Sequence, residues 1–249
     1  MKKAILVTSF GTSHRDTREK CLDLIQREVE EKYGSENVER AYTSRIIRRI
    51  IEKNEGIHIF DQEEGLKALK DRGFEKIITM SLHILDGIEY SKLDDKFGKI
   101  SKQLLADDED FKKIVENKEF NDLEGNDAIV FMGHGTESEA DYAYQKLQEE
   151  YLKAGKNNIF IATVEGKVTI KDVIEKMKGK GFRNILLKPL MIVAGDHAKN
   201  DMSSDDEDSW KTILKNEGYE VTAVLKGMGE YKFIREMFMD KLKDIYYLA

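Results

Sequence analysis

Short apolar runs alternate with amphipathic segments along the whole chain. Runs bounded by polar or turn residues are typical of buried strands, whereas apolar residues that recur every three or four positions predict helices. The pattern predicts strands at residues 4–9, 38–43, 76–82, 97–105, 128–132, 158–163, 184–193 and 220–225. It predicts helices at residues 16–33, 44–53, 62–72, 108–117, 139–154, 170–178, 206–216 and 231–247. Strands that alternate with helices indicate an α/β fold with parallel sheets.

Pro189 lies inside the predicted strand 184–193. Proline has no backbone N–H to donate to a strand ladder. We therefore expect an irregularity in the sheet at that point.

The pattern repeats once. AILVTSFGTS in the first half matches AIVFMGHGTE in the second, and RGFEKIITMSLHILDGIE matches KGFRNILLKPLMIVAGDH. A weaker match aligns NVERAYTS with NIFIATVE. Three matches in the same order predict a duplicated α/β unit, with halves at residues 1–124 and 125–249, and the last helix is free to pack back on the first half. The matched pairs are Phe10 with His134, Gly11 with Gly135, Ser44 with Glu165, Gly87 with Gly195, and Glu89 with His197.

Three potential metal ligands each follow a predicted strand of the second half. His134 lies in MGHGT, Glu165 in ATVEG and His197 in AGDHAK. In open parallel sheets, ligands bind outside the carboxyl ends of the strands, and these three strands are expected to be neighbours. Imidazole and carboxylate groups suit a first-row divalent metal. The sequence therefore predicts a metal site, although the spacing by itself is no specific metal motif.

The glycine-rich turn around His134 has a second interpretation. Gly133, Gly135 and Thr136 surround the histidine, and such a turn at a helix start can bind an anion. The chain lacks the dinucleotide and Walker fingerprints, which disfavours phosphate binding.

A run of acidic residues follows His197. Acidic residues in a first helical turn favour the helix dipole, and Ser203 or Ser204 can cap that helix. We interpret the run as a helix start rather than as a ligand set, with attraction of a cation as the alternative. The run consists of Asp205, Asp206, Glu207 and Asp208.

Composition narrows the classes of function. The chain has 249 residues and a net charge of -7, which disfavours a general nucleic-acid or anionic-membrane binder. No apolar stretch is long enough for a membrane span or a signal-peptide core, so we expect a cytoplasmic protein. The single cysteine, Cys21, excludes an internal disulfide and lies on an apolar helical face, where we expect it in the core. Arg45, Arg48 and Arg49 form either a solvated helix face or a local positive charge for an acidic ligand.

His83 also follows a predicted strand, in the first half. It lines the same site or has a structural role, and the sequence does not distinguish the two.

At these residues the sequence resembles the anaerobic sirohydrochlorin cobaltochelatases, the CbiK type of class II tetrapyrrole chelatase. The resemblance covers essentially the whole chain and includes LVTSFGTS, MGHGT, ATVEG and the long block GDHAKNDMSSDDEDSWK. It implies two similar flavodoxin-like α/β domains with an active-site cleft between them. It also implies a lyase that inserts Co(II) into sirohydrochlorin during anaerobic cobalamin biosynthesis.

The resemblance assigns the metal-handling roles to His134, Glu165 and His197. Metal insertion removes two pyrrole N–H protons, and histidine titrates near neutral pH, so we expect His134 to be ligand and base. His197 and Glu165 are expected as further ligands. Candidates for contact with the tetrapyrrole come from the first half, and they are Phe10, Gly11, Thr12, Leu85 and Glu89.

The metal is the least determined feature, because a nitrogen and oxygen donor set binds several divalent ions. An iron- or nickel-inserting chelatase is the nearest alternative, and a tetrapyrrole or metal carrier without turnover is the alternative from another class. We expect Co(II) as the substrate metal, no organic cofactor, and no nucleic-acid or membrane partner. The oligomeric state stays open, and a homo-oligomer is compatible with the sequence.

Overall fold

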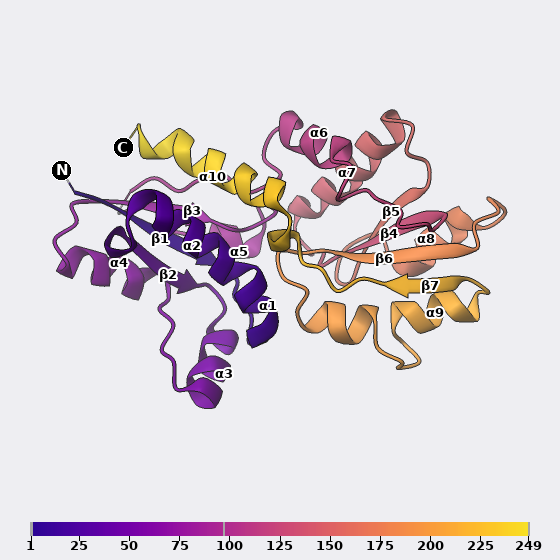
Figure 1. The fold of residues 1–249 in the computed structure, drawn as a ribbon, viewed down its shortest axis with the longest axis horizontal. Coiled ribbons are helices and arrows are strands. Elements are labelled where there is room, and N and C mark those ends of the chain that lie inside the picture. The colour runs from indigo at the N-terminus through magenta and orange to yellow at the C-terminus, as the bar shows by residue number, and fades with distance from the viewer. Residues whose placement is uncertain (1, 97, 249) are drawn as a thin grey trace. The chain divides into compact units, whose positions relative to one another are not determined.

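A computed structural model describes residues 2–96 and 98–248 of the chain (Figure 1). The contacts divide the chain into two compact units. Unit 1 comprises Met1–Ala106 and Gly229–Ala249, and unit 2 comprises Asp107–Met228. Residues 107–124, which the repeat places in the first half, thus pack with unit 2, and the last helix packs with unit 1.

Unit 1 contains a three-stranded parallel sheet with the order β2-β1-β3. The strands are β1 (Lys3–Ser9), β2 (Val38–Tyr42) and β3 (Lys76–Ser81). The helices are α1 (Arg15–Lys20), α2 (Leu22–Tyr33), α3 (Arg45–Glu55), α4 (Gln62–Asp71), α5 (Ile88–Ser91) and α10 (Lys232–Tyr246). Leu66 and Leu69 of α4 pack on one face of the sheet against Leu6. Alternation along the strand places every second side chain on that face, and the residues between them are buried on the other face, which explains the continuous apolar run of β1.

Unit 2 contains a four-stranded parallel sheet with the order β5-β4-β6-β7. The strands are β4 (Ala128–Gly133), β5 (Ile159–Thr163), β6 (Asn184–Leu190) and β7 (Glu220–Ala223). The helices are α6 (Asp108–Glu116), α7 (Tyr142–Lys153), α8 (Ile170–Met177) and α9 (Trp210–Asn216). Val130 packs with α8 and α9, whereas the next residue, Phe131, stacks on Phe120 with ring centroids 4.8 Å apart. Both faces of the sheet are therefore covered, and the predicted α/β class with two parallel sheets is confirmed.

Long-range contacts explain why α6 packs with unit 2 and α10 packs with unit 1, although the repeat places each of them in the other half. The buried Lys188 of β6 donates to the carbonyl of Phe120 at 3.0 Å, and Lys156 donates to the carbonyl of Val115 at 2.5 Å. These bonds hold α6 and the segment after it in unit 2. In unit 1, Arg235 of α10 forms an ion pair with Glu28 of α2 at 2.7 Å.

Four local predictions were wrong. The predicted helix 16–33 breaks at Cys21, which separates α1 from α2. The predicted strand 97–105 is only an isolated bridge between Ile100 and Thr79, and Phe97 lies outside the described residues. Two backbone hydrogen bonds, at 2.9 and 2.8 Å, join the segment to Thr79 before the chain turns toward the loop after β3. The third error concerns α9, which starts at Trp210 because Ser209 caps it.

The fourth error concerns Pro189, which keeps a regular register with Met132 of β4. Neighbouring residues of a strand point their backbone groups to opposite sides. The carbonyl of Leu187 accepts the backbone N–H of Val224 on the β7 side of the strand. Pro189 is two residues further along, so its backbone nitrogen also faces the β7 side. The pairing with β7 ends at Leu187 and Ala223, so no ladder bond is lost at the proline.

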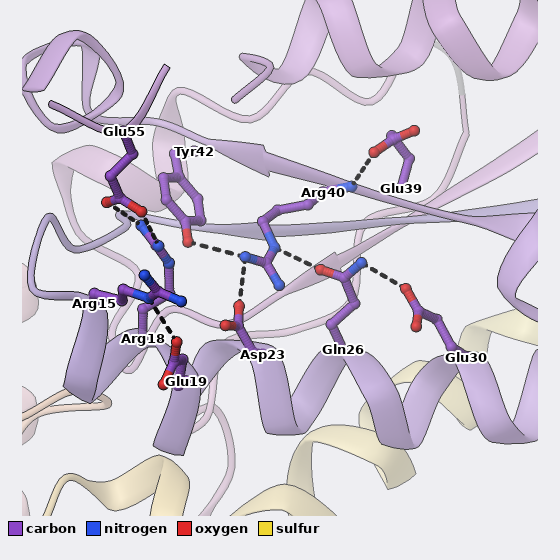
Figure 2. Close-up of polar contacts among 10 residues, drawn as sticks. All are labelled: Arg15, Arg18, Glu19, Asp23, Gln26, Glu30, Glu39, Arg40, Tyr42 and Glu55. Atoms are coloured by element: carbon purple, nitrogen blue, oxygen red, sulfur yellow. Dashed lines mark hydrogen bonds and ion pairs between the residues drawn. The ribbon is translucent and has the colours of Figure 1, made fainter. Parts of the chain in front are cut away.

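A polar network ties α1, α2 and α3 to the edge of the first sheet (Figure 2). Arg18 of α1 donates to both carboxylate oxygens of Glu55 at the end of α3, at 2.9 and 2.5 Å. Arg40 of β2 pairs with Asp23 of α2 at 2.6 Å. The Arg18 side chain is only 7% exposed, so the pair replaces the water that a guanidinium normally binds.

No helix within residues 2–96 and 98–248 combines the length and the apolar character that crossing a bilayer requires.

Candidate metal centre

The three predicted ligands lie at the carboxyl ends of three adjacent strands of the second sheet. His134 directly follows β4, Glu165 follows β5, and His197 lies in the segment after β6. The order β5-β4-β6 makes these strands neighbours, as predicted. In Figure 1 the labels of β4, β5 and β6 mark this sheet.

The structure brings the three side chains together. One ligand atom from each of His134, Glu165 and His197 lies within 4.8 Å of the others. Nδ1 of His134 is 3.6 Å from Oε2 of Glu165, and the two imidazole rings are perpendicular with centroids 4.7 Å apart. Around a cation bound at roughly 2.1 Å, as for Zn²⁺, tetrahedral ligand atoms are roughly 3.4 Å apart. The ligand atoms of the group lie up to 4.8 Å apart, so the side chains must rotate toward one another before all three bind one ion.

Two glycines allow the loops of His134 and Glu165 to touch. Gly135 has a φ of 82°, and a Cβ there would lie 2.2 Å from the backbone nitrogen of Gly166. The backbone N–H of Glu165 donates to the carbonyl of His134 at 2.8 Å. Glycine is required at residue 135 both for its left-handed backbone and for this close approach. The GHG sequence is therefore part of the geometry of the site.

Hydrogen bonds orient the two imidazoles. Nδ1 of His134 lies 3.0 Å from the carbonyl oxygen of Gly135, and Nδ1 of His197 lies 2.5 Å from Oδ2 of Asp201. A neutral imidazole that donates through Nδ1 carries its lone pair on Nε2. A carboxylate partner of this kind fixes the orientation and tautomer of a metal-binding histidine. Both rings can thus present Nε2 as a ligand.

A π-helical turn positions Asp201. Ala198–Met202 form this turn, η3, directly after His197. π-Helical turns are frequent at functional sites. Asp201 was not among the predicted site residues, although an acidic residue four positions after a histidine was an available signal. Asp141, a buried carboxylate that contacts both loops of the site, was not predicted either.

The candidate centre is open to solvent. The side chains of His134, Glu165 and His197 are 45%, 57% and 30% exposed. A structural metal site is closed by four protein ligands, whereas three ligands with an exposed side leave positions for a substrate. The arrangement therefore leaves coordination positions open for a further ligand.

A tyrosine of α7 packs against the turn that carries His134. Tyr144 is buried, and a Cβ at Gly133 would lie 2.5 Å from its ring. Burial raises the pKa of Tyr144 to about 12. The tyrosine is therefore neutral and acts as packing under the turn.

The predicted substrate contacts of unit 1 lie at the carboxyl edge of the first sheet. Phe10 follows β1 and is 45% exposed, and Leu85 is partly exposed in the segment after β3. Gly11 has a φ of 96° and packs against the Tyr42 ring, where a Cβ would lie 2.4 Å away. Thr12 is buried and accepts the N–H of His14 at 3.2 Å. Phe10 and Leu85 thus offer surface, whereas Gly11 and Thr12 shape the turn.

Two further polar residues lie at the same edge. Glu89 forms an ion pair with Lys92. His83 is 8% exposed, its Nδ1 lies 2.9 Å from the hydroxyl of Ser81, and burial lowers its pKa to about 4. His83 is therefore neutral at pH 7. It is not part of the group formed by His134, Glu165 and His197.

The acidic run after His197 is not the first turn of α9, which corrects the prediction. It lies in the turn that precedes Ser209 and Trp210. Asp205 pairs with Lys211 at 2.7 Å, and Asp206 accepts from Ser204 at 2.9 Å.

The basic helix α3 contains one paired and two exposed arginines. Arg48 lies 3.2 Å from Asp61 and 3.5 Å from Glu64, so it fastens α3 to α4. Arg45 and Arg49 are exposed.

A groove of about 350 Å³ lies beside the site loops, between α7, β5 and α8. Its walls include Tyr144, Gln148 and Ile161, and none of the three potential ligands lines it. The ligand geometry, rather than the hollow, identifies the candidate centre.

Comparison with known proteins gives a consistent family. A family model described as cobalt chelatase (CbiK) matches residues 3–247. The sirohydrochlorin cobaltochelatase of Salmonella typhimurium is 34% identical over 260 residues, covering 100% of this chain and 98% of that protein. The sirohydrochlorin cobaltochelatase CbiKC of Nitratidesulfovibrio vulgaris is 31% identical over 262 residues, covering 97% of this chain and 89% of that protein.

Solved structures show the same fold. SirB from Bacillus subtilis with Fe³⁺ has a TM-score of 0.65 at 13% identity, over 98% of this chain and 96% of that chain. The sirohydrochlorin chelatase SirB from Bacillus subtilis subspecies spizizenii in complex with cobalt has a TM-score of 0.61 at 9% identity, over 98% and 95%. These likenesses confirm the predicted chelatase-like α/β fold.

Proposed function

Since the chain belongs to the cobalt chelatase family described as CbiK, we propose that it is a sirohydrochlorin cobaltochelatase that inserts Co²⁺ into a tetrapyrrole. The observation that carries the proposal for the site is the group of His134, Glu165 and His197, whose ligand atoms lie within 4.8 Å of one another. Their partial exposure suits the transfer of an ion to a second ligand.

The reaction exchanges one cation for two protons. Co²⁺ enters the ring as two pyrrole N–H protons leave, so the charge of the macrocycle is conserved. The three side chains hold the ion and leave coordination positions for the ring nitrogens. Nε2 of His134 can accept one of the two protons once the metal has moved to the ring, and the second passes through the Glu165 carboxylate to solvent. While the ion is bound, Glu165 offsets part of its charge.

Unit 1 supplies our candidates for contact with the tetrapyrrole. Phe10 and Leu85 offer apolar surface to a flat ring, whereas Gly11 and Thr12 shape the turn behind them. Glu89 is held by Lys92 and places a polar group at the same edge.

Metallation assays test the proposal. Purified protein with Co²⁺ and sirohydrochlorin is expected to form the metal complex faster than a control without protein. A His134→Ala variant is expected to lose most of this rate, because one of three ligands and the proton acceptor disappear. If the unmodified protein gave the same rate as the uncatalysed control, the proposed enzymatic activity would be refuted, and a tetrapyrrole or metal carrier would remain as the alternative.

The metal requires its own measurement. Two imidazoles and one carboxylate bind several first-row divalent ions, and the intrinsic order of affinity does not single out cobalt. Rates with Co²⁺, Fe²⁺ and Ni²⁺ under identical conditions are expected to be highest with Co²⁺. A higher rate with Fe²⁺ or Ni²⁺ would assign the protein to that metal.

A further inference from the structure

A buried carboxylate lies between the two loops that carry His134 and Glu165. Asp141 is 1% exposed and directly precedes helix α7. Its Oδ1 accepts the backbone N–H of Thr136 at 3.2 Å, and its Oδ2 accepts the backbone N–H of Lys167 at 2.9 Å. Each oxygen thus binds the chain two residues after a potential ligand.

The contact between the loops and the carboxylate is tight. A Cβ at Gly166 would lie 2.2 Å from Oδ1 of Asp141 and 2.5 Å from the hydroxyl of Thr163. On its other side, Gly166 meets Gly135, as described above. The carboxylate, the 165–167 loop and the 134–136 turn are therefore packed without room for an extra methyl group.

Capping of helix α7 alone would not explain the hydrogen bonds of Asp141. A residue at a helix start normally accepts from N–H groups of its own helix. Asp141 instead accepts from two other segments, one on each side of the candidate centre. Burial of a carboxylate is unfavourable unless hydrogen bonds satisfy it, and here the two bonds come from the two loops.

We propose that Asp141 is a positioning residue, which sets the separation of His134 and Glu165 for metal binding. The inference rests on the proposed role of these two side chains as ligands. His197 is held separately through Asp201, so loss of Asp141 loosens one pair of ligands and leaves the third in place.

Asparagine is the informative substitution. It has nearly the same shape, but it offers one acceptor oxygen, and its amide group points N–H donors at the other backbone N–H. One of the two loops therefore loses its bond. Loss of a residue that orients metal ligands typically reduces metal affinity by about 10- to 100-fold.

Asp127 provides a matched control in the same unit. Its Oδ2 accepts the backbone N–H groups of Arg183 and Asn184 at 2.7 and 2.8 Å. It directly precedes β4, at the amino ends of the strands, whereas the candidate centre lies at their carboxyl ends. Asp127→Asn removes a carboxylate charge away from the metal ligands, while its single amide oxygen can still accept both N–H groups. It therefore controls for the loss of charge, and Asp141→Asn in addition loses the bond to one loop.

The experiment is a Co²⁺ titration of the full chain without tetrapyrrole, followed through the visible absorption of bound Co²⁺. Asp141→Asn is expected to weaken Co²⁺ binding by about 10- to 100-fold and to change the spectrum. Asp127→Asn is expected to bind Co²⁺ like the unmodified protein. In metallation, the Co²⁺ concentration for half-maximal rate is expected to rise more than the maximal rate falls.

Unchanged Co²⁺ affinity and spectrum in folded Asp141→Asn would overturn the inference, as would an equal loss in Asp127→Asn. If Asp141→Asn does not fold, Asp141→Ser replaces it, because a serine hydroxyl accepts one N–H and suits a helix start. Failure of the proposed site looks different, since His134→Ala would then bind Co²⁺ as tightly as the unmodified protein.

Discussion

Replacement of Gly135 by alanine tests whether the close approach of two loops creates the metal centre. The added Cβ would lie 2.2 Å from the nitrogen and 2.8 Å from the Cα of Gly166. A normal separation is roughly 3.5 Å, so the backbone at Glu165 and Gly166 must retreat by about 1 Å. The hydrogen bond from Glu165 to the carbonyl of His134, now 2.8 Å long, would break.

The magnitude follows from two separate effects. The left-handed backbone at residue 135 costs an alanine about 1–2 kcal/mol of stability. A displacement of about 1 Å in a reactive site lowers the rate on the order of 100-fold, or about 2.7 kcal/mol of transition-state stabilisation.

Gly155→Ala separates these effects. Gly155 lies in the same unit with a φ of 75°, and a Cβ there would meet nothing within 4 Å. Gly155→Ala is therefore expected to lose about 1–2 kcal/mol in denaturant unfolding, and Gly135→Ala is expected to lose more, because its displaced backbone also breaks a hydrogen bond. Only Gly135→Ala is expected to lose metallation rate and Co²⁺ affinity.

The assay measures initial metallation rates of folded protein at several Co²⁺ concentrations, with unfolding curves recorded on the same samples. A Gly135→Ala protein that metallates at the unmodified rate would refute the reasoning, because the ligand geometry would then not depend on the approach of the loops. An equal loss of rate in both variants would also refute it, since backbone strain alone would account for the effect.

Three further predictions concern unit 1. Glu55→Gln leaves the buried Arg18 without a full ionic partner and is expected to cost about 3 kcal/mol in denaturant unfolding. Glu19→Gln removes the partner of an exposed arginine and is expected to change the stability far less, so similar losses would contradict the buried pair shown in Figure 2. Burial lowers the pKa of His83 to about 4, whereas the imidazole of the unfolded chain has a pKa of about 6.5. As the pH is lowered from about 6.5 to 4, only the unfolded chain gains a proton at this residue, so the free energy of unfolding falls by about 1.4 kcal/mol per pH unit. Unfolding curves of His83→Gln are expected to lack this part of the pH dependence, and an identical pH profile would argue against a buried neutral imidazole. Burial raises the pKa of Cys21 to about 12, so its thiol is expected to react with a disulfide reagent only after the protein unfolds. The absorbance of the thiolate released from the reagent measures this reaction, and a rapid reaction in the folded state would contradict the prediction.

The sequence by itself determined the class of fold, and it predicted a duplication and the candidate ligands. Alternation of apolar and polar residues is a local property, and it predicted most strands and helices within a few residues. Parallel strands place their carboxyl ends at one edge, so three residues at strand ends could be expected together before any distance was known. Motifs from GHGT to GDHAKND also carried the family resemblance.

Only the tertiary structure decided how the ligands are held. Asp141 is 26 residues from Lys167, and no local pattern shows that their contact joins two loops. The π-helical turn that brings Asp201 to His197 follows from a backbone path that apolar periodicity does not encode. The assignment of residues 107–124 to unit 2 likewise depends on bonds such as Lys188 to Phe120, 68 residues apart. These features arise from contacts between distant segments, which hydrophobic patterns along the chain do not specify.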